Sequence, residues 1–230
     1  MDELYPRCLY EEIGCRGRDA FLHTGGQPDP WLSRPGGDDR MGLTLVLRPS
    51  PEAAEAVLRA LEPLRRLEPR QYFYPASDLH ITVLDLIPGQ PGLPCPPPPL
   101  VRRYWDLLAP GLADTAAFPV SLRGLTVSES AVLVKGYYHL GTLDVLRARL
   151  REALVQGGLP ARERYETRSC HLTAMRLAAP VSDPSAFLNA LRQLEDHPLG
   201  VFPVCQAELV YHDWYDARKH TLASFPMHPQ

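Results

Sequence analysis

The fold is decided by a seven-residue stretch that recurs in altered form later in the chain. The first copy is Asp78-Leu79-His80-Ile81-Thr82-Val83-Leu84, and the second is Ser169-Cys170-His171-Leu172-Thr173-Ala174-Met175. Each copy is His-x-Thr within a short apolar run, and the two histidines are 91 residues apart. Side chains two residues apart in a β-strand point to the same face of the sheet. Each copy therefore predicts a strand that presents one imidazole and one hydroxyl side by side.

The segments around the two copies repeat in the same order, which is strand, helix, His-x-Thr strand, helix, strand. Leu45, in the first expected strand, precedes its motif histidine by 35 residues, and Val134 precedes the second by 37. Ser50, followed by proline, is a typical N-cap for the first helix, and residues 142–156 have the apolar periodicity of a helix. The matching offsets indicate a duplicated unit with a pseudo-two-fold axis that brings the two motifs together.

Some segments lie outside this repeat. Residues 1–40 contain many glycine and proline turn formers without apolar periodicity, which predicts an irregular N-terminal extension before a two-lobed domain at residues 41–230. Residues 88–99 end in consecutive prolines, which predicts an extended and exposed insert. Towards the C-terminus we expect a strand at residues 201–211 that forms a hairpin with a final strand at residues 220–227.

The composition is that of a soluble globular protein and argues against several classes of function. Of 230 residues, 45% are hydrophobic and 22% charged, and the net charge of −3 provides no basic field for non-specific nucleic-acid binding. The five cysteines are scattered without a CxxC pair, so we expect reduced thiols in a cytoplasmic protein, with no membrane span. P-loop, HExxH, GxSxG and GxGxxG motifs are absent, and no cluster has metal-ligand spacing, so we predict neither a cofactor nor a metal.

A single His-x-Thr strand is ordinary, because β-propensity explains the threonine and a hydrogen bond to a neighbour satisfies the histidine. Two copies in register favour a shared site instead. The four side chains of that site are His80, Thr82, His171 and Thr173. Two imidazoles with an ordinary pKa of about 6.5 suit acid–base catalysis on a phosphodiester, in which one accepts a proton and the other donates one. Threonine hydroxyls and backbone N–H groups would stabilise the phosphate oxygens.

With this pair of motifs, residues 41–227 resemble the 2H phosphoesterase superfamily, which includes the RNA 2′,3′-cyclic phosphodiesterases once called 2′–5′ RNA ligases. Arg176 follows the second motif as it does in the bacterial members. Asp85 departs from that pattern, because the bacterial RNA enzymes tend to have an aromatic residue there, and this indicates a divergent branch. The resemblance implies a bilobal α+β fold in which two antiparallel sheets face a central cleft, with the helices outside and both motifs on the cleft floor.

The resemblance also implies a metal-independent phosphodiesterase. Its expected substrate is a 2′,3′-cyclic phosphate or another small cyclic or 2′–5′ linked nucleotide, either free or at an RNA end. The alternative is a non-catalytic nucleotide- or RNA-binding module on the same fold, which would bind without turnover. We expect a monomer with no membrane partner. The sequence leaves open which histidine is the acid and which is the base.

Four further side chains are candidates for substrate binding. Tyr72 and Tyr74 precede the first motif, and Tyr211 lies near the final hairpin, so each could stack on a base or pack in the core. Arg176 lies an odd number of residues after His171, so a regular strand would point it to the opposite face. Only a bulge or the strand end would bring it to a phosphate, and a structural ion pair is the other interpretation.

Overall fold

The structure is a computed structural model that describes residues 4–34, 37–139 and 141–229. Its elements, in chain order, are α1 (Leu4–Thr24), β1 (Arg40–Leu47), α2 (Pro51–Leu67), β2 (Tyr72–Phe73), the 3-10 turn η1 (Ala76–Asp78), β3 (Ile81–Pro91), α3 (Pro98–Ala113), β4 (Phe118–Val127), β5 (Ala131–Tyr138), α4 (Thr142–Gln156), β6 (Leu172–Arg176), α5 (Pro184–Arg192), β7 (Pro198–Val204), β8 (Gln206–Asp213) and β9 (Lys219–Pro226).

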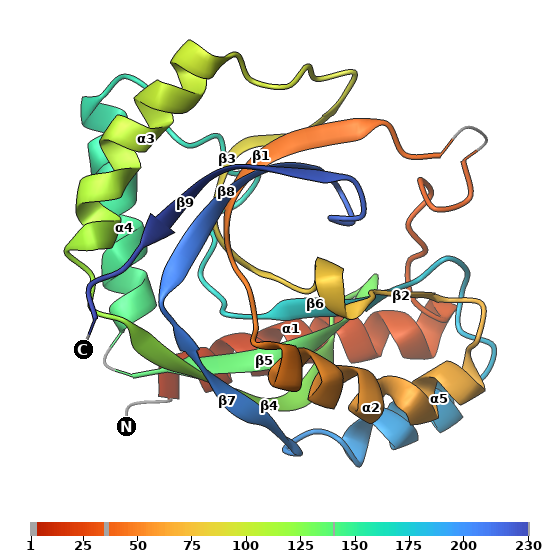
Figure 1. Cartoon of the computed structure of the whole chain (residues 1–230). Helices are drawn as coiled ribbons and strands as arrows, with labels where there is room; N and C mark the ends of the chain where they lie inside the picture. The colour runs from red at the N-terminus through yellow and green to blue at the C-terminus, as the bar shows by residue number, and fades with distance from the viewer. Residues whose placement is uncertain (1–3, 35–36, 140, 230) are drawn as a thin grey trace.

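The strands form one antiparallel sheet that curls around its own concave face (Figure 1). Their order is β7-β4-β5-β6-β3-β1-β8-β9, and β2 also pairs with β6. The two His-x-Thr strands, β3 and β6, are neighbours at the centre of this order. The α+β class is confirmed, and the two expected antiparallel sheets are the two halves of one sheet that joins at the motif strands.

Helices cover the outer side of the sheet (Figure 1). Helices α3 and α4 pack against the half that contains β3 and β9, whereas α1, α2 and α5 pack against the half that contains β4 and β7. The helix of each repeat crosses to the opposite half, because α2 follows β1 but contacts β7, and α4 follows β5 but contacts β3. This exchange interlocks the two repeats. None of the described helices is long and apolar enough to cross a membrane.

Local sequence signals explain where two of these helices begin. The Ser50 hydroxyl accepts a hydrogen bond from the Ala53 N–H of α2 at 3.3 Å, and Asp183 accepts one from the Ala186 N–H of α5 at 2.9 Å. A proline follows each capping residue, where its missing N–H and fixed φ are tolerated. The expected cap of α2 at Ser50 is therefore confirmed.

The N-terminal region differs from the prediction, because α1 replaces most of the expected irregular extension. The buried residues of this helix are Tyr10, Gly14, Gly17 and Phe21. They recur at helical spacing, but two of them are glycines, so the hydrophobic pattern that signals a helix is weak. A Cβ atom on Gly17 would lie 2.2 Å from the Val127 carbonyl oxygen, so the glycine allows α1 to approach β4 closely.

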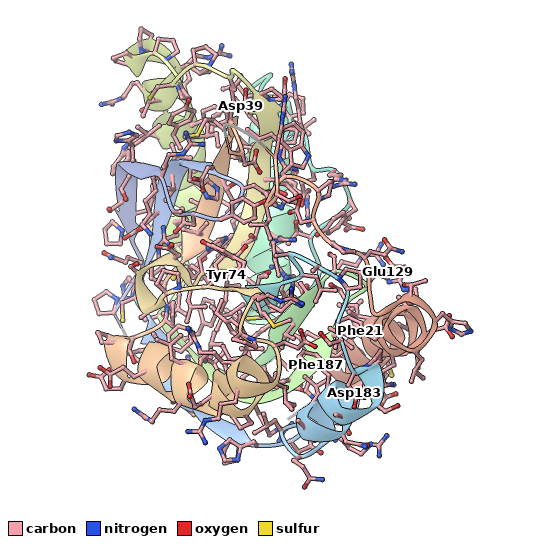
Figure 2. The ribbon with its side chains drawn as sticks, turned by 90° about the vertical axis from the view of Figure 1, so that its right-hand side faces the viewer. Phe21, Asp39, Tyr74, Glu129, Asp183 and Phe187 are labelled. Carbon is pink, nitrogen blue, oxygen red and sulfur yellow. The ribbon has the colours of Figure 1, made fainter. Side chains whose placement is uncertain are left out.

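Two aromatic side chains anchor α1. The Tyr10 hydroxyl donates to the Gly136 carbonyl at 3.0 Å and accepts from the Cys170 N–H at 3.2 Å, immediately before the second motif histidine. Phe21 stacks on Phe187 of α5 with 5.5 Å between ring centroids (Figure 2). The N-terminal helix is thus part of the packed fold and touches the backbone that carries the second motif.

Two other segments also differ from the prediction. The insert expected at residues 88–99 is shorter, because β3 extends into it as far as Pro91 and α3 begins at Pro98. The single strand expected at residues 201–211 is two strands interrupted at Cys205. Its first part pairs with β4 and its second part with β1, so the chain passes from one half of the sheet to the other at the interruption. The expected hairpin with the final strand is confirmed as β8–β9.

Candidate active site

The centre of the sheet brings the two motifs side by side. Ile81 of β3 pairs with Leu172 of β6 across antiparallel strands, and both side chains are fully buried in the core. Because the two strands are antiparallel, the positions next to this pair place His80 opposite Thr173 and Thr82 opposite His171. On the opposite, concave face lie the four polar motif residues, all of them partly exposed: His80, Thr82, His171 and Thr173. The four residues therefore surround a pseudo-two-fold axis through the Ile81–Leu172 pair.

A β-bulge follows the first motif. Thr82 and Leu84 pair with neighbouring residues of β1, which leaves Val83 as an extra residue. An extra residue reverses the alternation of faces beyond it. Asp85 consequently shares the concave face with Thr82, and the Thr44 hydroxyl on the adjacent strand donates to its carboxylate at 3.2 Å.

A second bulge follows the second motif at the equivalent position. Thr173 and Met175 pair with neighbouring residues of β5, which leaves Ala174 as the extra residue. Arg176 therefore lies on the same face as Thr173, which is the condition on which its predicted phosphate contact depends. Its Nε donates to the Tyr74 hydroxyl at 2.9 Å, and in the described part of the chain its terminal nitrogens have no hydrogen-bond acceptor.

His80 is anchored by a group two residues upstream. Its Nδ1 lies 2.8 Å from the Asp78 carbonyl oxygen and 3.9 Å from the Asp216 carboxylate. A carbonyl oxygen only accepts hydrogen bonds, so Nδ1 carries the proton and Nε2 remains available to a substrate. Burial lowers the pKa of His80 to about 3, although the charge of Asp216 acts in the opposite direction. The imidazole is therefore neutral at pH 7.

His171 is anchored in the same way. Its Nδ1 lies 2.6 Å from the hydroxyl of Ser169, again two residues upstream. Burial lowers the pKa of His171 to about 4, and the positive charges of Arg147 and Arg176 lower it further. Both imidazoles are thus neutral at pH 7, so the ordinary value of about 6.5 assumed from the sequence applies to neither.

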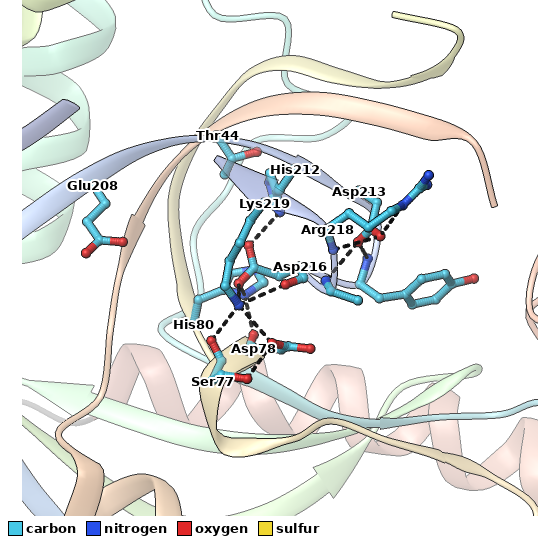
Figure 3. Close-up of polar contacts among 12 residues, drawn as sticks. Thr44, Ser77, Asp78, His80, Glu208, His212, Asp213, Asp216, Arg218 and Lys219 are labelled. Atoms are coloured by element: carbon cyan, nitrogen blue, oxygen red, sulfur yellow. Dashed lines mark hydrogen bonds and ion pairs between the residues drawn. The ribbon is translucent and has the colours of Figure 1, made fainter. Parts of the chain in front are cut away.

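A charged cluster that the sequence did not reveal lies beside His80 (Figure 3). At its centre is the fully buried Asp216. Its partners are Arg48, His212 and Lys219, the last two at 2.9 and 3.1 Å. Burial alone would raise the pKa of Asp216, but the adjacent His212 and the hydrogen-bonded Arg48 outweigh burial and hold that pKa below its usual range. Among the described residues, no three His, Cys, Asp or Glu side chains are grouped as metal ligands.

Arg147 of α4 fixes the spacing of the two motifs. It is only 1% exposed, and its guanidinium donates to backbone carbonyl oxygens on both sides. On the first motif strand it reaches Thr82 and Val83 at 2.7 and 3.0 Å, and before the second it reaches Arg168 and Ser169 at 3.0 and 2.7 Å. Sequence reasoning missed this residue, because it stands among the leucines of an ordinary amphipathic helix.

The segment before β1 reaches the site through a stack of arginines and tryptophans. The guanidinium of Arg40 lies between the rings of Trp31 and Trp214, at 4.5 and 4.6 Å from their centroids. Trp214 in turn lies 5.3 Å from the guanidinium of Arg176. Contacts of this kind contribute about 0.5–1 kcal/mol each when exposed and more when desolvated. The stack therefore links the N-terminal region to the end of β6.

The three predicted tyrosines have different positions. Tyr72 pairs with Arg176 across β2 and β6 and is half-buried, so it borders the site. Tyr74 lies buried inside the fold (Figure 2). Its hydroxyl accepts a hydrogen bond from Arg176, so it orients that side chain. Tyr211 lies on the core face of β8, opposite to the face of His212, and its hydroxyl donates to a backbone carbonyl. The structure therefore does not bring Tyr211 to the site.

Solved structures share this fold at low sequence identity. TT0787 of Thermus thermophilus is 18% identical with a TM-score of 0.61, over 83% of this chain and 99% of that chain. LigT of E. coli complexed with 3′-AMP is 14% identical with a TM-score of 0.57, over 82% and 99% of the two chains. ATU0111 of Agrobacterium tumefaciens is 17% identical with a TM-score of 0.54, over 86% and 93%. At these identities the likeness concerns the fold.

The sequence itself also has a match. None of the curated proteins is significantly similar to this chain. The sequence model of the 2'-5' RNA ligase superfamily matches residues 49–216, which is more than half of the chain. The chain therefore belongs to the 2'-5' RNA ligase superfamily, as the resemblance at its two His-x-Thr motifs indicated, and this membership supports a phosphoesterase-type function.

Proposed function

We propose that this protein is a phosphodiesterase that hydrolyses a 2′,3′-cyclic phosphate, or another small cyclic or 2′–5′ linked nucleotide, through two histidines and without a metal ion. The observation that carries the proposal is the position of two imidazoles and two hydroxyls on one face around the Ile81–Leu172 pair. The complex of the related LigT fold with 3′-AMP supports a nucleotide substrate. As part of this proposal, the protein is a cytoplasmic monomer. Its five cysteines all lie in the described ranges, and all are free thiols.

In the proposed reaction, a water molecule attacks phosphorus while one ester oxygen leaves from the opposite side. One histidine accepts a proton from the attacking water, and the other donates a proton to the leaving oxygen. The new O–P bond thus forms as the ester P–O bond breaks, and the hydroxyls of Thr82 and Thr173 donate to the non-bridging oxygens. A pseudo-symmetric pair suits this chemistry, because attack and departure take place on opposite sides of the phosphorus.

The protonation states add a requirement. Both histidines are neutral at pH 7 before substrate binds, so the catalytic acid must first gain a proton. The negative charge of a bound phosphodiester raises the pKa of a nearby imidazole. We therefore expect ligand binding near pH 6 to take up about one proton, because two adjacent imidazolium ions would repel each other. Calorimetry in buffers of different ionisation enthalpy measures this uptake.

Two neighbouring side chains complete the proposed site. Arg176 would bind a phosphate oxygen through its terminal nitrogens, while Tyr74 holds its Nε. Tyr72 would offer the edge of its half-buried ring to a base. Tyr74 itself acts as a positioning residue, because its ring is buried.

Turnover of a panel of cyclic and 2′–5′ linked nucleotides tests the proposal. We expect His80→Ala and His171→Ala each to lower kcat by about 100-fold or more, the range for losing a general acid or base, without loss of the folded circular dichroism spectrum. His197→Ala is the matched control, because His197 is exposed and lies outside the site. Full activity in either motif variant would overturn the two-histidine mechanism.

Two further outcomes bear on the same proposal. EDTA should leave the rate unchanged, and strong inhibition that added metal reverses would overturn the metal-independent mechanism. Binding of a 2′,3′-cyclic nucleotide by the wild-type protein without any product would favour the non-catalytic nucleotide-binding module instead.

A further inference from the structure

The four central residues cannot by themselves orient an asymmetric substrate. Rotation about the axis through the Ile81–Leu172 pair exchanges the two histidines and the two threonines. A 2′,3′-cyclic phosphate has two different ester bonds, and its orientation between the histidines decides which bond breaks. A residue outside the four must therefore break the symmetry.

The positions just beyond the two bulges differ in charge. Asp85 and Arg176 each lie three residues after a motif threonine, and each is turned to the concave face by the bulge between them.

Asp85 is a largely buried carboxylate with little compensation. Burial raises its pKa, the Thr44 hydroxyl and the nearby His212 lower it, and Glu163 raises it further. Among the described residues, no lysine or arginine lies within ion-pair distance of it, and Thr44 is its one hydrogen-bond donor. A buried carboxylate without a countercharge costs free energy, and an ionised carboxylate can accept about four hydrogen bonds. Asp85 therefore has acceptor positions available to a ligand on the face that carries the two motifs.

We propose that Asp85 orients the substrate by accepting a hydrogen bond from a hydroxyl or amino group of the nucleoside, while Arg176 holds the phosphate end. This inference rests on the proposed function. Repulsion excludes an anionic group from the Asp85 side, and attraction favours one on the Arg176 side. The substrate class is then a nucleoside cyclic phosphate with a neutral hydrogen-bond donor opposite its phosphate. The same orientation decides whether the product carries a 2′- or a 3′-phosphate.

A cycle of enzyme and substrate changes tests this role. Asp85→Ala and Asp85→Asn are compared with the wild type on adenosine 2′,3′-cyclic phosphate, on the analogue without the 6-amino group and on the 5′-deoxy analogue. We expect Asp85→Ala to lower kcat/KM for the full substrate by about 10- to 100-fold, which corresponds to a hydrogen bond to a charged group, and Asp85→Asn to lower it less. The loss should vanish for whichever analogue lacks the donor, which identifies amine or hydroxyl. Equal losses on all three substrates would overturn the proposal.

Product analysis gives a second readout. Asp85→Ala should increase the share of the minor product isomer, and an unchanged ratio of 2′- to 3′-phosphate would overturn the orienting role. Asp114→Asn is the matched control, because Asp114 is exposed at the end of α3. If the wild type hydrolyses neither these three substrates nor any other member of the panel of cyclic and 2′–5′ linked nucleotides, the proposed function fails. The same comparison of variants and substrates, made with dissociation constants in place of kcat/KM, then still tests the role of Asp85. A loss of binding that vanishes for one analogue supports this role, and an equal loss of binding for all three compounds overturns it.

Discussion

The two motif strands share one backbone geometry but differ in their charged neighbours, because among the described residues carboxylates lie beside the first motif only. In both, the histidine is anchored through Nδ1 two residues upstream, and a bulge follows the threonine. Two carboxylates lie beside the first motif, namely Asp85 and the buried Asp216, and the second of these is paired with Arg48 and Lys219. The charged groups that act on the second motif histidine are the guanidinium groups of Arg176 and of Arg147, which also bonds to the first motif strand. The repeated geometry can supply an acid and a base on opposite sides of a phosphate, whereas the unlike neighbours can give the reaction a direction.

Among the substitutions that test this difference between the two motifs, the largest expected effect on stability is at Asp216. Asp216→Ala should lower the free energy of unfolding by about 4 kcal/mol, because removing one partner of a buried ion pair costs roughly 3–5 kcal/mol. Arg48 and Lys219 would lose their common acceptor. Urea denaturation measures the effect. Asp216→Asn is the control for the backbone, since asparagine also tolerates the left-handed conformation at φ 60° and lacks only the charge.

The corresponding change beside the second motif is Ser169→Ala. It removes one neutral hydrogen bond to His171, so we expect a loss of only about 1 kcal/mol. Equal destabilisation by the changes at Ser169 and Asp216 would show that the two halves do not differ electrostatically in the way described.

Arg147 bonds to the backbone of both motifs, so its substitution tests whether these bonds hold the two motifs at a fixed distance. Arg147→Met should lower the free energy of unfolding by about 3 kcal/mol, because several backbone carbonyls of both motifs lose a buried donor. It should also lower kcat, since the distance between the two histidines is no longer fixed. Arg149→Met on the same helix is the control, because within the described part of the chain Arg149 makes one weak hydrogen bond, to the Gly111 carbonyl at 3.4 Å. A folded Arg147 variant with wild-type kcat would contradict the positioning role.

Acid should destabilise the protein through both histidines. Their folded-state pKa values of about 3 and 4 lie below the ordinary value, so the unfolded chain binds protons first as the pH falls. Stability is therefore complete above about pH 6.5, and between pH 7.5 and 5 each histidine should remove about 2 kcal/mol. His171→Asn should lose about 2 kcal/mol less over this range than the wild type. The raised pKa of Asp85 acts in the opposite sense in both proteins, so the difference between them isolates the histidine.

An effect as small as that of Ser169→Ala is expected from weakening the support that α1 gives to the second motif. Tyr10→Phe removes the hydroxyl that bonds to Gly136 and to the N–H of Cys170. We expect a loss of about 1 kcal/mol in thermal unfolding and a modest decrease in kcat. Tyr104→Phe is the control, because that buried tyrosine has no hydrogen bond among the described contacts. An identical response of both variants would show that α1 contributes packing alone.

Several local features could be predicted because short-range chemistry controls them. The cap at Ser50 and the proline after it start α2, and the leucine spacing of residues 142–156 gives α4 with the expected bounds. Helix α1 was missed because Gly14 and Gly17 occupy its buried face, so close approach to β4 replaces hydrophobic side chains there. The sequence left open whether Tyr211 stacks on a base or packs in the core, and the structure places it on the core face of β8.

The sequence by itself determined the pair of His-x-Thr strands, their duplicated setting and the kind of chemistry that such a pair favours. These follow from strand alternation and from the spacing of like segments, which are properties of the chain alone. Only the tertiary structure decided that Asp85 and Arg176 face the histidines, and that Asp216 lies beside His80. A bulge exists only relative to the partner strand, and a buried charge cluster assembles from distant segments, so neither has a local signature in the sequence.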